Sequence, residues 1–247
     1  SVAPFVRRYV GSKDYINNDE IRYCLWLRDV PANLYRKNNE IMRRLAAVKE
    51  MRLKSTAAPT RAMADAPYKF FSAPQKEGDC LCIPEVSSER RKYIPMGFLK
   101  SGIIASNKLL ILPDASIYHF GVLISNVHMA WTRTVCGRLK SDYQYSGAIV
   151  YNNFPWPIPT EQQKQRIEQT AQAILDARAL YPDSSLADLY DELTMPPELR
   201  KAHRDNDRAV MDAYGFIKGT AARTSESACV AELMKLYQQK ASELEKS

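Results

Sequence analysis

Three prolines at alternate positions, in the string YNNFPWPIP over residues 151–159, constrain this chain more than any other local feature. Proline fixes its own φ and keeps the residue before it out of the helical region, so the chain must run extended here. Directly afterwards, Thr160 and Gln163 have the spacing of a capping box, which marks the start of a helix. The sequence therefore predicts a boundary between two unlike parts, which we place at 155/156.

The part before this boundary mixes strand and helix patterns. An amphipathic helix with a basic outer face is predicted over residues 32–54, and a loop rich in Ala, Pro and Thr over 55–75. Short β-rich runs between turn residues then predict strands over 80–84, 91–96, 103–104, 108–112, 117–124 and 140–145. We expect the run at 117–124 to lead into a helix that reaches residue 133.

The part after the boundary has helical periodicity throughout. Apolar residues at helical spacing predict a helix that begins at Thr160, followed by helices over 185–193, 197–214 and 225–246. We therefore expect an α+β fold, with a mixed-sheet domain over residues 1–155 and an all-helical domain over residues 156–247.

Charge is divided in the same way. The 247 residues carry a net charge of +7, but residues 1–155 hold 23 Lys and Arg against 13 Asp and Glu, whereas residues 156–247 hold 12 against 15. A basic domain joined to a mildly acidic one is typical of a polyanion-binding module with an attached scaffold. The alternative is a solvated basic surface, and the composition favours neither.

Several classes of protein are excluded by what the sequence lacks. No apolar run approaches the roughly 18 residues of a membrane helix, and no signal-peptide pattern precedes the first strand. The cysteines are odd in number, which predicts free thiols in a reducing cytoplasm rather than a disulfide scaffold or a zinc site; they are Cys24, Cys80, Cys82, Cys136 and Cys229. Glycine-rich cofactor loops, a nucleophile elbow and an HExxH motif are all absent from the sequence, so we expect no catalysis by this chain itself.

A cluster of hydroxyls and cations suits the phosphate oxygens of a nucleic acid, which position a protein without giving sequence information. The predicted phosphate contacts of this cluster are Ser87, Ser88, Arg90, Arg91 and Lys92. Further cations that extend the same track are Lys100, Arg133 and Arg138, with Arg43 and Arg44 from the predicted basic helix. Each of them is equally compatible with an ordinary surface charge.

The segment 137–145 carries a more specific signal. If it forms one strand, Lys140, Asp142 and Gln144 project from the same face, because side chains alternate along a strand. Lys can donate to guanine O6 and N7, Asp can accept from cytosine N4, and Gln suits adenine N6 and N7. Lys140 and Asp142 could thus read the two halves of one G·C pair; a salt-bridged polar strand face remains the alternative.

Five strings together resemble the C-terminal part of MmeI-family proteins: SSERRKYIPMGF (87–98), FGVLISNVHMAW (120–131), GRLKSDYQYS (137–146), YNNFPWP (151–157) and SLADLYDELTMPPELRKAH (185–203). These are bacterial single-chain type II restriction-modification enzymes that also methylate DNA. The resemblance implies a target recognition domain followed by a helical C-terminal region. It favours Lys140 and Asp142 as the pair that reads bases, with Gln144 beside them. More loosely, it indicates Glu85, Asn107 and Lys108 as further base-reading residues.

The same resemblance implies a longer parent protein, in keeping with a first residue other than Met. In the family, an endonuclease region and an adenine methyltransferase domain that uses S-adenosylmethionine precede this part; cleavage would also require Mg²⁺. Neither the Asn-Pro-Pro-aromatic motif nor a cofactor loop occurs in this chain, so no catalytic or cofactor residue can be carried over. The chain is therefore predicted to bind double-stranded DNA and to contact an upstream methyltransferase domain of the same polypeptide. Two alternatives are a specificity subunit of a type I-like system and a basic module that binds RNA or protein.

Overall fold

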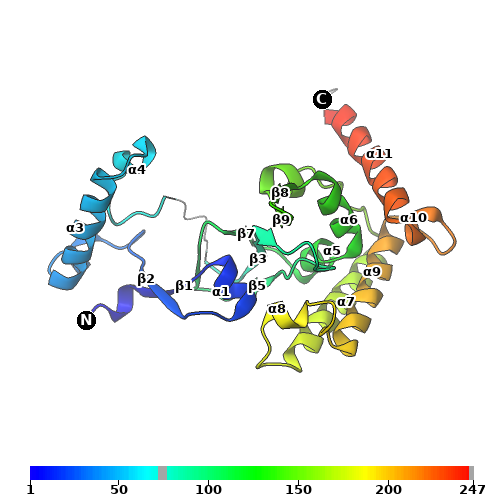
Figure 1. Ribbon diagram of the computed structural model, residues 1–247, viewed down its shortest axis with the longest axis horizontal. Helices are drawn as coiled ribbons and strands as arrows, with labels where there is room; N and C mark the ends of the chain where they lie inside the picture. The colour runs from blue at the N-terminus through cyan, green and yellow to red at the C-terminus, as the bar shows by residue number, and fades with distance from the viewer. Residues whose placement is uncertain (72–76, 245–247) are drawn as a thin grey trace.

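A computed structural model describes residues 1–71 and 77–244 and confirms the α+β class. Within these residues, helices and three small sheets make up the first part, and every regular element of the second part is a helix (Figure 1). The last two residues of the helix predicted over 225–246, and part of the loop predicted over 55–75, lie outside the described residues.

An N-terminal lobe, which contains residues 26–71, stands apart from the rest of the molecule in Figure 1. It is joined to the rest through β1 (Val6–Val10) and β2 (Arg22–Leu25). The helix predicted over 32–54 is divided into α2 (Ala32–Tyr35) and α3 (Asn39–Leu53), because Asn38 leaves the helical region and its side chain caps α3 by accepting from Glu40 and Ile41 N. Ile41 and Leu45 are buried in a cluster with Leu27 and Tyr35, as their spacing predicts. Leu34 and Leu53, at the two ends of the predicted helix, are exposed. The short helix α4 (Ala58–Ala62) lies where a loop was predicted.

Each of the three sheets has three strands. The first has the order β2-β1-β6, with β2 antiparallel and β6 (Ile104–Ala105) parallel to β1, and a short helix α1 (Ser12–Asn17) connects its hairpin strands. The second has the order β5-β3-β7, and its strands are Gly97–Leu99, Cys80–Pro84 and Leu109–Pro113. The third has the order β4-β9-β8, and its strands are Val86–Ser87, Asp142–Gln144 and Gly137–Leu139. Residues 91–96, predicted as a strand, form no strand.

The strand predicted over 117–124 is wrong, because this segment forms the helix α5 (Ile117–Leu123). Its continuous apolar character reflects complete burial: Phe120, Val122 and Leu123 have no exposed surface. A fully buried helix and a fully buried strand cannot be distinguished by periodicity. The helix α6 (Asn126–Val135) follows, with Ser125 as its N-cap.

The helical part begins as predicted. Thr160 and Gln163 form the capping box of α7 (Glu161–Ala179). It is followed by α8 (Leu186–Leu189), which is shorter than predicted, α9 (Pro197–Ala213), α10 (Ala221–Thr224) and α11 (Glu226–Leu244). Gln163 also donates through Nε2 to the Asp212 carbonyl, 2.9 Å away, which ties the start of α7 to the end of α9.

One hydrophobic core continues across the proline-rich boundary. It joins residues of α5 and α6 to residues of α7, α9 and α11, such as Phe120, Ile167 and Leu199. Gly121 lets α5 approach α7 and α9 closely, since the Asn206 side chain donates to the Gly121 carbonyl at 2.8 Å. The mixed part and the helical part of the chain therefore share one core.

Replacement of Gly121 with Ala should destabilise the whole chain. An added Cβ would lie 2.7 Å from Ile167 Cγ2 and 2.9 Å from Ala171 Cβ, so α5 and α7 must move apart. Overpacking of this kind costs about 1–3 kcal/mol, which urea unfolding followed by circular dichroism would measure. Gly137→Ala is the matched control, because its Cβ would meet nothing closer than 3.9 Å. Equal unfolding midpoints for the two variants would contradict the shared core.

Candidate nucleic-acid interface

The segment predicted to be one base-reading strand is a hairpin. β8 pairs antiparallel with β9, in the register Gly137↔Gln144, Arg138↔Tyr143 and Leu139↔Asp142. Lys140 lies in the turn with a φ of 57°, a left-handed conformation that turns require and strands do not. The prediction that Lys140, Asp142 and Gln144 share one strand face is therefore wrong for Lys140. Asp142 and Gln144 keep the alternation, since Tyr143 between them is buried and both flanking residues are partly exposed.

Asp142 contacts the loop formed by residues 88–92, which we name the basic loop. Its Oδ1 accepts from the Glu89 backbone N at 3.3 Å, so the carboxylate binds this loop directly. Arg91 of the basic loop is half-buried; burial lowers the pKa of its guanidinium, and the neighbouring carboxylates of Asp142 and Asp191 counteract this lowering. Asp142 and the predicted phosphate contacts of the basic loop are thus parts of one surface.

The three loosely predicted residues, Glu85, Asn107 and Lys108, lie beside the hairpin. Lys108 Nζ pairs with Glu85 Oε2 at 3.0 Å, and the Glu85 backbone N donates to the Lys108 carbonyl at 3.0 Å. The Glu85 carbonyl in turn accepts from Tyr145 N at 2.7 Å, immediately after Gln144. Asn107, exposed, precedes Lys108. The structure therefore brings Glu85 and Lys108 to the edge of the sheet that carries Gln144.

The predicted phosphate contacts differ in their accessibility. Arg90 and Lys92 are exposed, and Ser88 is partly exposed, with its Oγ accepting from Arg90 N at 3.3 Å. Ser87 is only 2% exposed, because it pairs with Tyr143 inside the β4-β9-β8 sheet. A phosphate cannot reach the Ser87 hydroxyl in this conformation, so we correct the prediction for this residue.

The cations expected to extend the track are held in different places. Arg138 is exposed, stacks over the Tyr143 ring at 4.2 Å and donates to the Ser141 carbonyl, which keeps it on the hairpin. Arg133 pairs with Glu226 Oε2 at 2.9 Å and donates to the Lys92 carbonyl at 3.1 Å, so it fixes the backbone of the basic loop to α6 and α11. Lys100 pairs with Asp79 at 2.8 Å, an interaction that lowers the pKa of that carboxyl.

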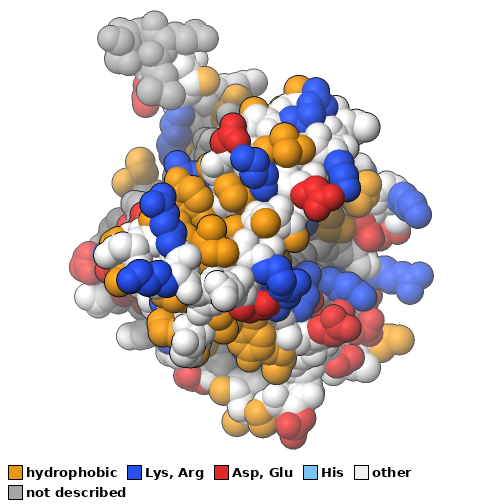
Figure 2. Space-filling model, turned by 90° about the vertical axis from the view of Figure 1, so that its left-hand side faces the viewer, with side chains coloured by type: hydrophobic (Ala, Val, Ile, Leu, Met, Phe, Trp, Pro, Cys, Tyr) orange, Lys and Arg blue, Asp and Glu red, His pale blue; other side chains and the backbone are white. Residues whose placement is uncertain are grey.

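Arg43 and Arg44 belong to the N-terminal lobe. Both pair with Glu40, at 2.9 Å and 2.7 Å, on the surface of α3, and they hold the pKa of that carboxyl down at about 2. Figure 1 shows α3 and the β8–β9 hairpin at separate places in the molecule, so these two arginines and the basic loop form no single cluster. Figure 2 shows Lys and Arg side chains spread among apolar ones over the face that the N-terminal lobe presents. The positive charge of the first part is therefore distributed.

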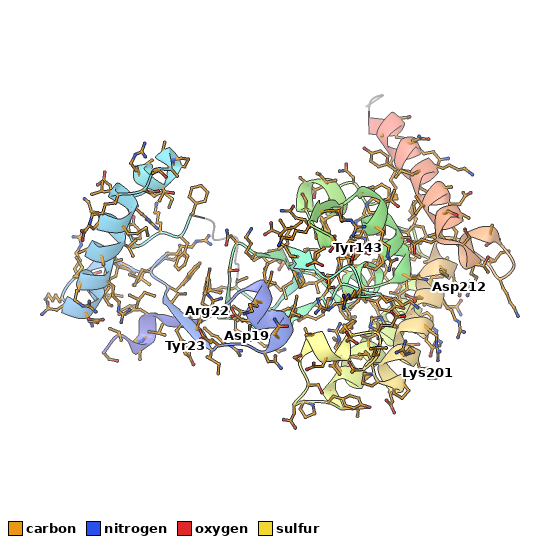
Figure 3. The ribbon with its side chains drawn as sticks, viewed as in Figure 1. Asp19, Arg22, Tyr23, Tyr143, Lys201 and Asp212 are labelled. Atoms are coloured by element: carbon orange, nitrogen blue, oxygen red, sulfur yellow. The ribbon has the colours of Figure 1, made fainter. Side chains whose placement is uncertain are left out.

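The residues that hold the basic loop were missed by sequence reasoning. Tyr93 follows the loop and is 2% exposed; its hydroxyl donates to Asp207 Oδ2 at 2.7 Å. Figure 3 labels Tyr143 of the hairpin and, on α9, Lys201 and Asp212. The one available signal was an aromatic residue directly after a run of cations, and it does not indicate a partner over a hundred residues away.

The cysteines and histidines give no site of their own. All five cysteines have free thiols, as predicted, and burial raises the pKa of Cys82 to about 12 and that of Cys24 to about 11. Within residues 1–71 and 77–244, no three His, Cys, Asp or Glu side chains are grouped so that they could hold a metal ion. Across the same residues, no helix is both long enough and apolar enough to cross a membrane.

The fold and this surface define the class of protein: an α+β recognition module whose polar hairpin and basic loop are supported by a helical region. Residues 1–158 match the target recognition domain of MmeI, and residues 159–245 match the MmeI C-terminal domain. The chain therefore belongs to the MmeI family.

Two relatives agree with this assignment. DNA methyltransferase A of Bacillus subtilis (strain 168) is 38% identical over 238 residues, which are 96% of this chain and 26% of that protein. A structure of the Type IIL restriction-modification enzyme MmeI in complex with DNA superimposes with a TM-score of 0.91 at 46% identity, over 98% of this chain and 32% of that one. This chain thus spans about a quarter to a third of the length of these relatives.

Proposed function

We propose that this chain selects the double-stranded DNA sequence on which a larger restriction-modification methyltransferase acts. The observation that carries the proposal is the contact between Asp142 and the basic loop, because it places a base-reading acid next to cations suited to phosphates. Phosphate contacts set the register of a protein on a duplex, and polar side chains in a groove then read base edges. The relative that was solved with DNA supports this function.

Each predicted reader has a defined chemical role in this proposal. Asp142 accepts from cytosine N4, Lys140 at the tip of the hairpin donates to the paired guanine, and Gln144 suits adenine. Glu85 and Lys108 neutralise one another in the free chain. In the complex, Lys108 would donate to an acceptor of a base pair and Glu85 would accept from a donor of the same pair, in place of their bond to one another. Asn107 lies beside them.

The larger protein would supply the chemistry. We propose that an upstream domain of the same polypeptide binds S-adenosylmethionine and methylates adenine at N6 after flipping it out of the stack. Any DNA cleavage by that protein would use a further nuclease region with Mg²⁺. The name of the relative from Bacillus subtilis, a DNA methyltransferase, supports the first of these activities. The helical region of this chain would pack against the upstream domains.

DNA binding by this chain should weaken steeply with salt. Each neutralised phosphate releases counterions, which gives a slope of about −0.9 in a plot of log K against log salt concentration. Arg90→Ala and Lys92→Ala, two exposed positions of the basic loop, should each reduce the slope by about one. Fluorescence anisotropy with a labelled duplex over a salt series would measure it.

The matched control for these variants is Lys201→Ala. Lys201 is an exposed cation of α9, paired with Asp205 at 2.7 Å and remote from the hairpin in Figure 3. It should leave the slope unchanged. Binding that is independent of salt, or equally strong binding of single-stranded RNA in competition, would contradict the proposed function.

A further inference from the structure

The C-terminal end of the basic loop is fixed to the helical region. Tyr93, the residue that follows the loop, is buried and reaches α9 in two ways. Its hydroxyl donates to Asp207 Oδ2 at 2.7 Å, and its ring stacks on the His203 ring with centroids 4.1 Å apart and planes 23° apart. Asp207 and His203 are also buried, so bulk water does not compete with either contact.

Asp207 and His203 are themselves held by other elements. Asp207 Oδ1 accepts from Asn126 N at 2.8 Å, at the first turn of α6, where the helix dipole favours a carboxylate. His203 Nε2 shares a hydrogen bond of 2.8 Å with the Tyr190 hydroxyl. Tyr93 is therefore held by groups that cannot easily shift.

Two further bonds fix the backbone on either side of Tyr93. Arg133 of α6 donates to the Lys92 carbonyl at 3.1 Å while pairing with Glu226 of α11. Arg178 of α7 donates to the Met96 carbonyl at 2.7 Å. The stretch that leaves the basic loop is thus held by side chains from α6, α7 and α9.

The other end of the basic loop contacts the hairpin. Glu89 N donates to Asp142 Oδ1 at 3.3 Å, and the Tyr143 hydroxyl bonds the Glu89 carbonyl at 3.5 Å. A displacement of the loop would therefore move a donor away from the carboxylate that reads a base. Base selectivity responds to such shifts because direct readout depends on hydrogen-bond geometry.

We infer that Asp207 and His203 are positioning residues for sequence selection: they hold Tyr93, and through it the basic loop that orients Asp142. This inference rests on the proposed function and gives the helical region a part in specificity. Asp207 and His203 lie behind the loop, buried in the protein core, and act without touching DNA.

Tyr93→Phe tests the inference with the smallest change. The variant keeps the ring on His203 and removes only the hydroxyl that donates to Asp207. The probe is a pool of duplexes with a randomised central segment, selected by binding to the full chain and then sequenced. We expect selectivity to fall about fivefold at one position of the enriched motif, the effect of losing one hydrogen bond. Affinity for unselected duplex should stay within about twofold, because the loop cations remain.

Asp207→Asn and the double variant show whether the hydroxyl acts through Asp207. Asp207→Asn replaces the charged acceptor of the Tyr93 hydroxyl with a neutral amide, so it weakens the bond that Tyr93→Phe removes. The double variant should therefore select no worse than Tyr93→Phe alone. Tyr181→Phe is the matched control: it also removes a hydroxyl bonded to a carboxylate, that of Glu198 at 2.9 Å, but within the helical region. It should select as the unmodified chain does. Circular dichroism confirms that each variant is folded at the assay temperature.

The outcomes separate the two proposals. Enrichment of one identical motif by the unmodified chain, Tyr93→Phe and Asp207→Asn would overturn the positioning role and leave the proposed function standing. Relaxation by Tyr181→Phe equal to that by Tyr93→Phe would also overturn it, since a general loss of rigidity would then suffice. Absence of any enriched motif with the unmodified chain would overturn the proposed function itself.

Discussion

Lys140→Glu combined with Asp142→Arg should change the base preferred at one position of the recognised site and leave the other positions unchanged. The exchange reverses donor and acceptor at the hairpin tip, so a surface that suits one orientation of a G·C pair would suit the opposite orientation. A mismatched base pair costs about 1–3 kcal/mol. A loss for the old pair together with a gain for the new one should therefore reverse the preference about tenfold or more.

The specificity of methylation is the best measure of this exchange. The pair is introduced into a longer protein that carries this chain behind its methyltransferase domain, and host DNA is sequenced with detection of modified bases. Lys201→Glu with Asp205→Lys is the matched control, because it reverses an ion pair of 2.7 Å on α9. An unaltered methylated motif in the Lys140/Asp142 variant would eliminate the assignment of this reading pair.

Local signals in the sequence predicted those parts of the fold that depend on nearby residues. The proline string and the capping box of Thr160 and Gln163 located the start of α7, since both act within one helical turn. Strands over 80–84 and near 109–113 were predicted from compact apolar runs, and they pair in the β5-β3-β7 sheet. The α+β class followed from the change of pattern at the same boundary.

Predictions failed where tertiary contacts decide the conformation. The residues of α5 are apolar on every side because α7 and α9 cover them, and such a run has no period that distinguishes a helix from a strand. Lys140 was placed on a strand because alternation continues through it, whereas the polar pair Lys140-Ser141 forms the hairpin turn. At the candidate site, the contact between Glu89 and Asp142 and the bond between Tyr93 and Asp207 join residues 53 and 114 positions apart, which no local pattern encodes.

The buried histidines predict that the chain loses stability in mild acid. His128 has no exposed surface and bonds the Tyr145 hydroxyl at 2.9 Å, and burial lowers its pKa to about 3. Burial also lowers the pKa of His203 well below its ordinary value, and the nearby charges of Arg178 and Lys92 act in the same direction. In the unfolded chain each of these histidines has a pKa near 6.5 and takes up a proton below it, whereas in the folded chain both stay neutral at that pH. The contribution of the two neutral histidines to the free energy of unfolding is therefore complete above pH 6.5. It is lost as the pH falls toward their pKa in the folded chain.

The carboxyl of Asp207 changes the stability of the chain in the opposite direction as the pH falls. Burial raises the pKa of this carboxyl to about 6, which the hydrogen bonds from Tyr93 and Asn126 only partly counter. Between pH 6 and the ordinary aspartate range, the folded chain holds a proton that the unfolded chain has released. Proton uptake by Asp207 therefore stabilises the fold as the pH falls. This gain offsets the loss of stability from about one of the two histidines.

The net expectation is a fall of about 2 kcal/mol in the free energy of unfolding between pH 7 and pH 5, since each unbalanced proton contributes about 1.4 kcal/mol per pH unit. Urea unfolding at a series of pH values measures this slope. His128→Gln removes one titrating group and should flatten the curve by about 1 kcal/mol per pH unit, whereas Asp207→Asn removes the offset and should steepen it. Parallel curves for these two variants would show that neither group is held in the protonation state that its burial imposes.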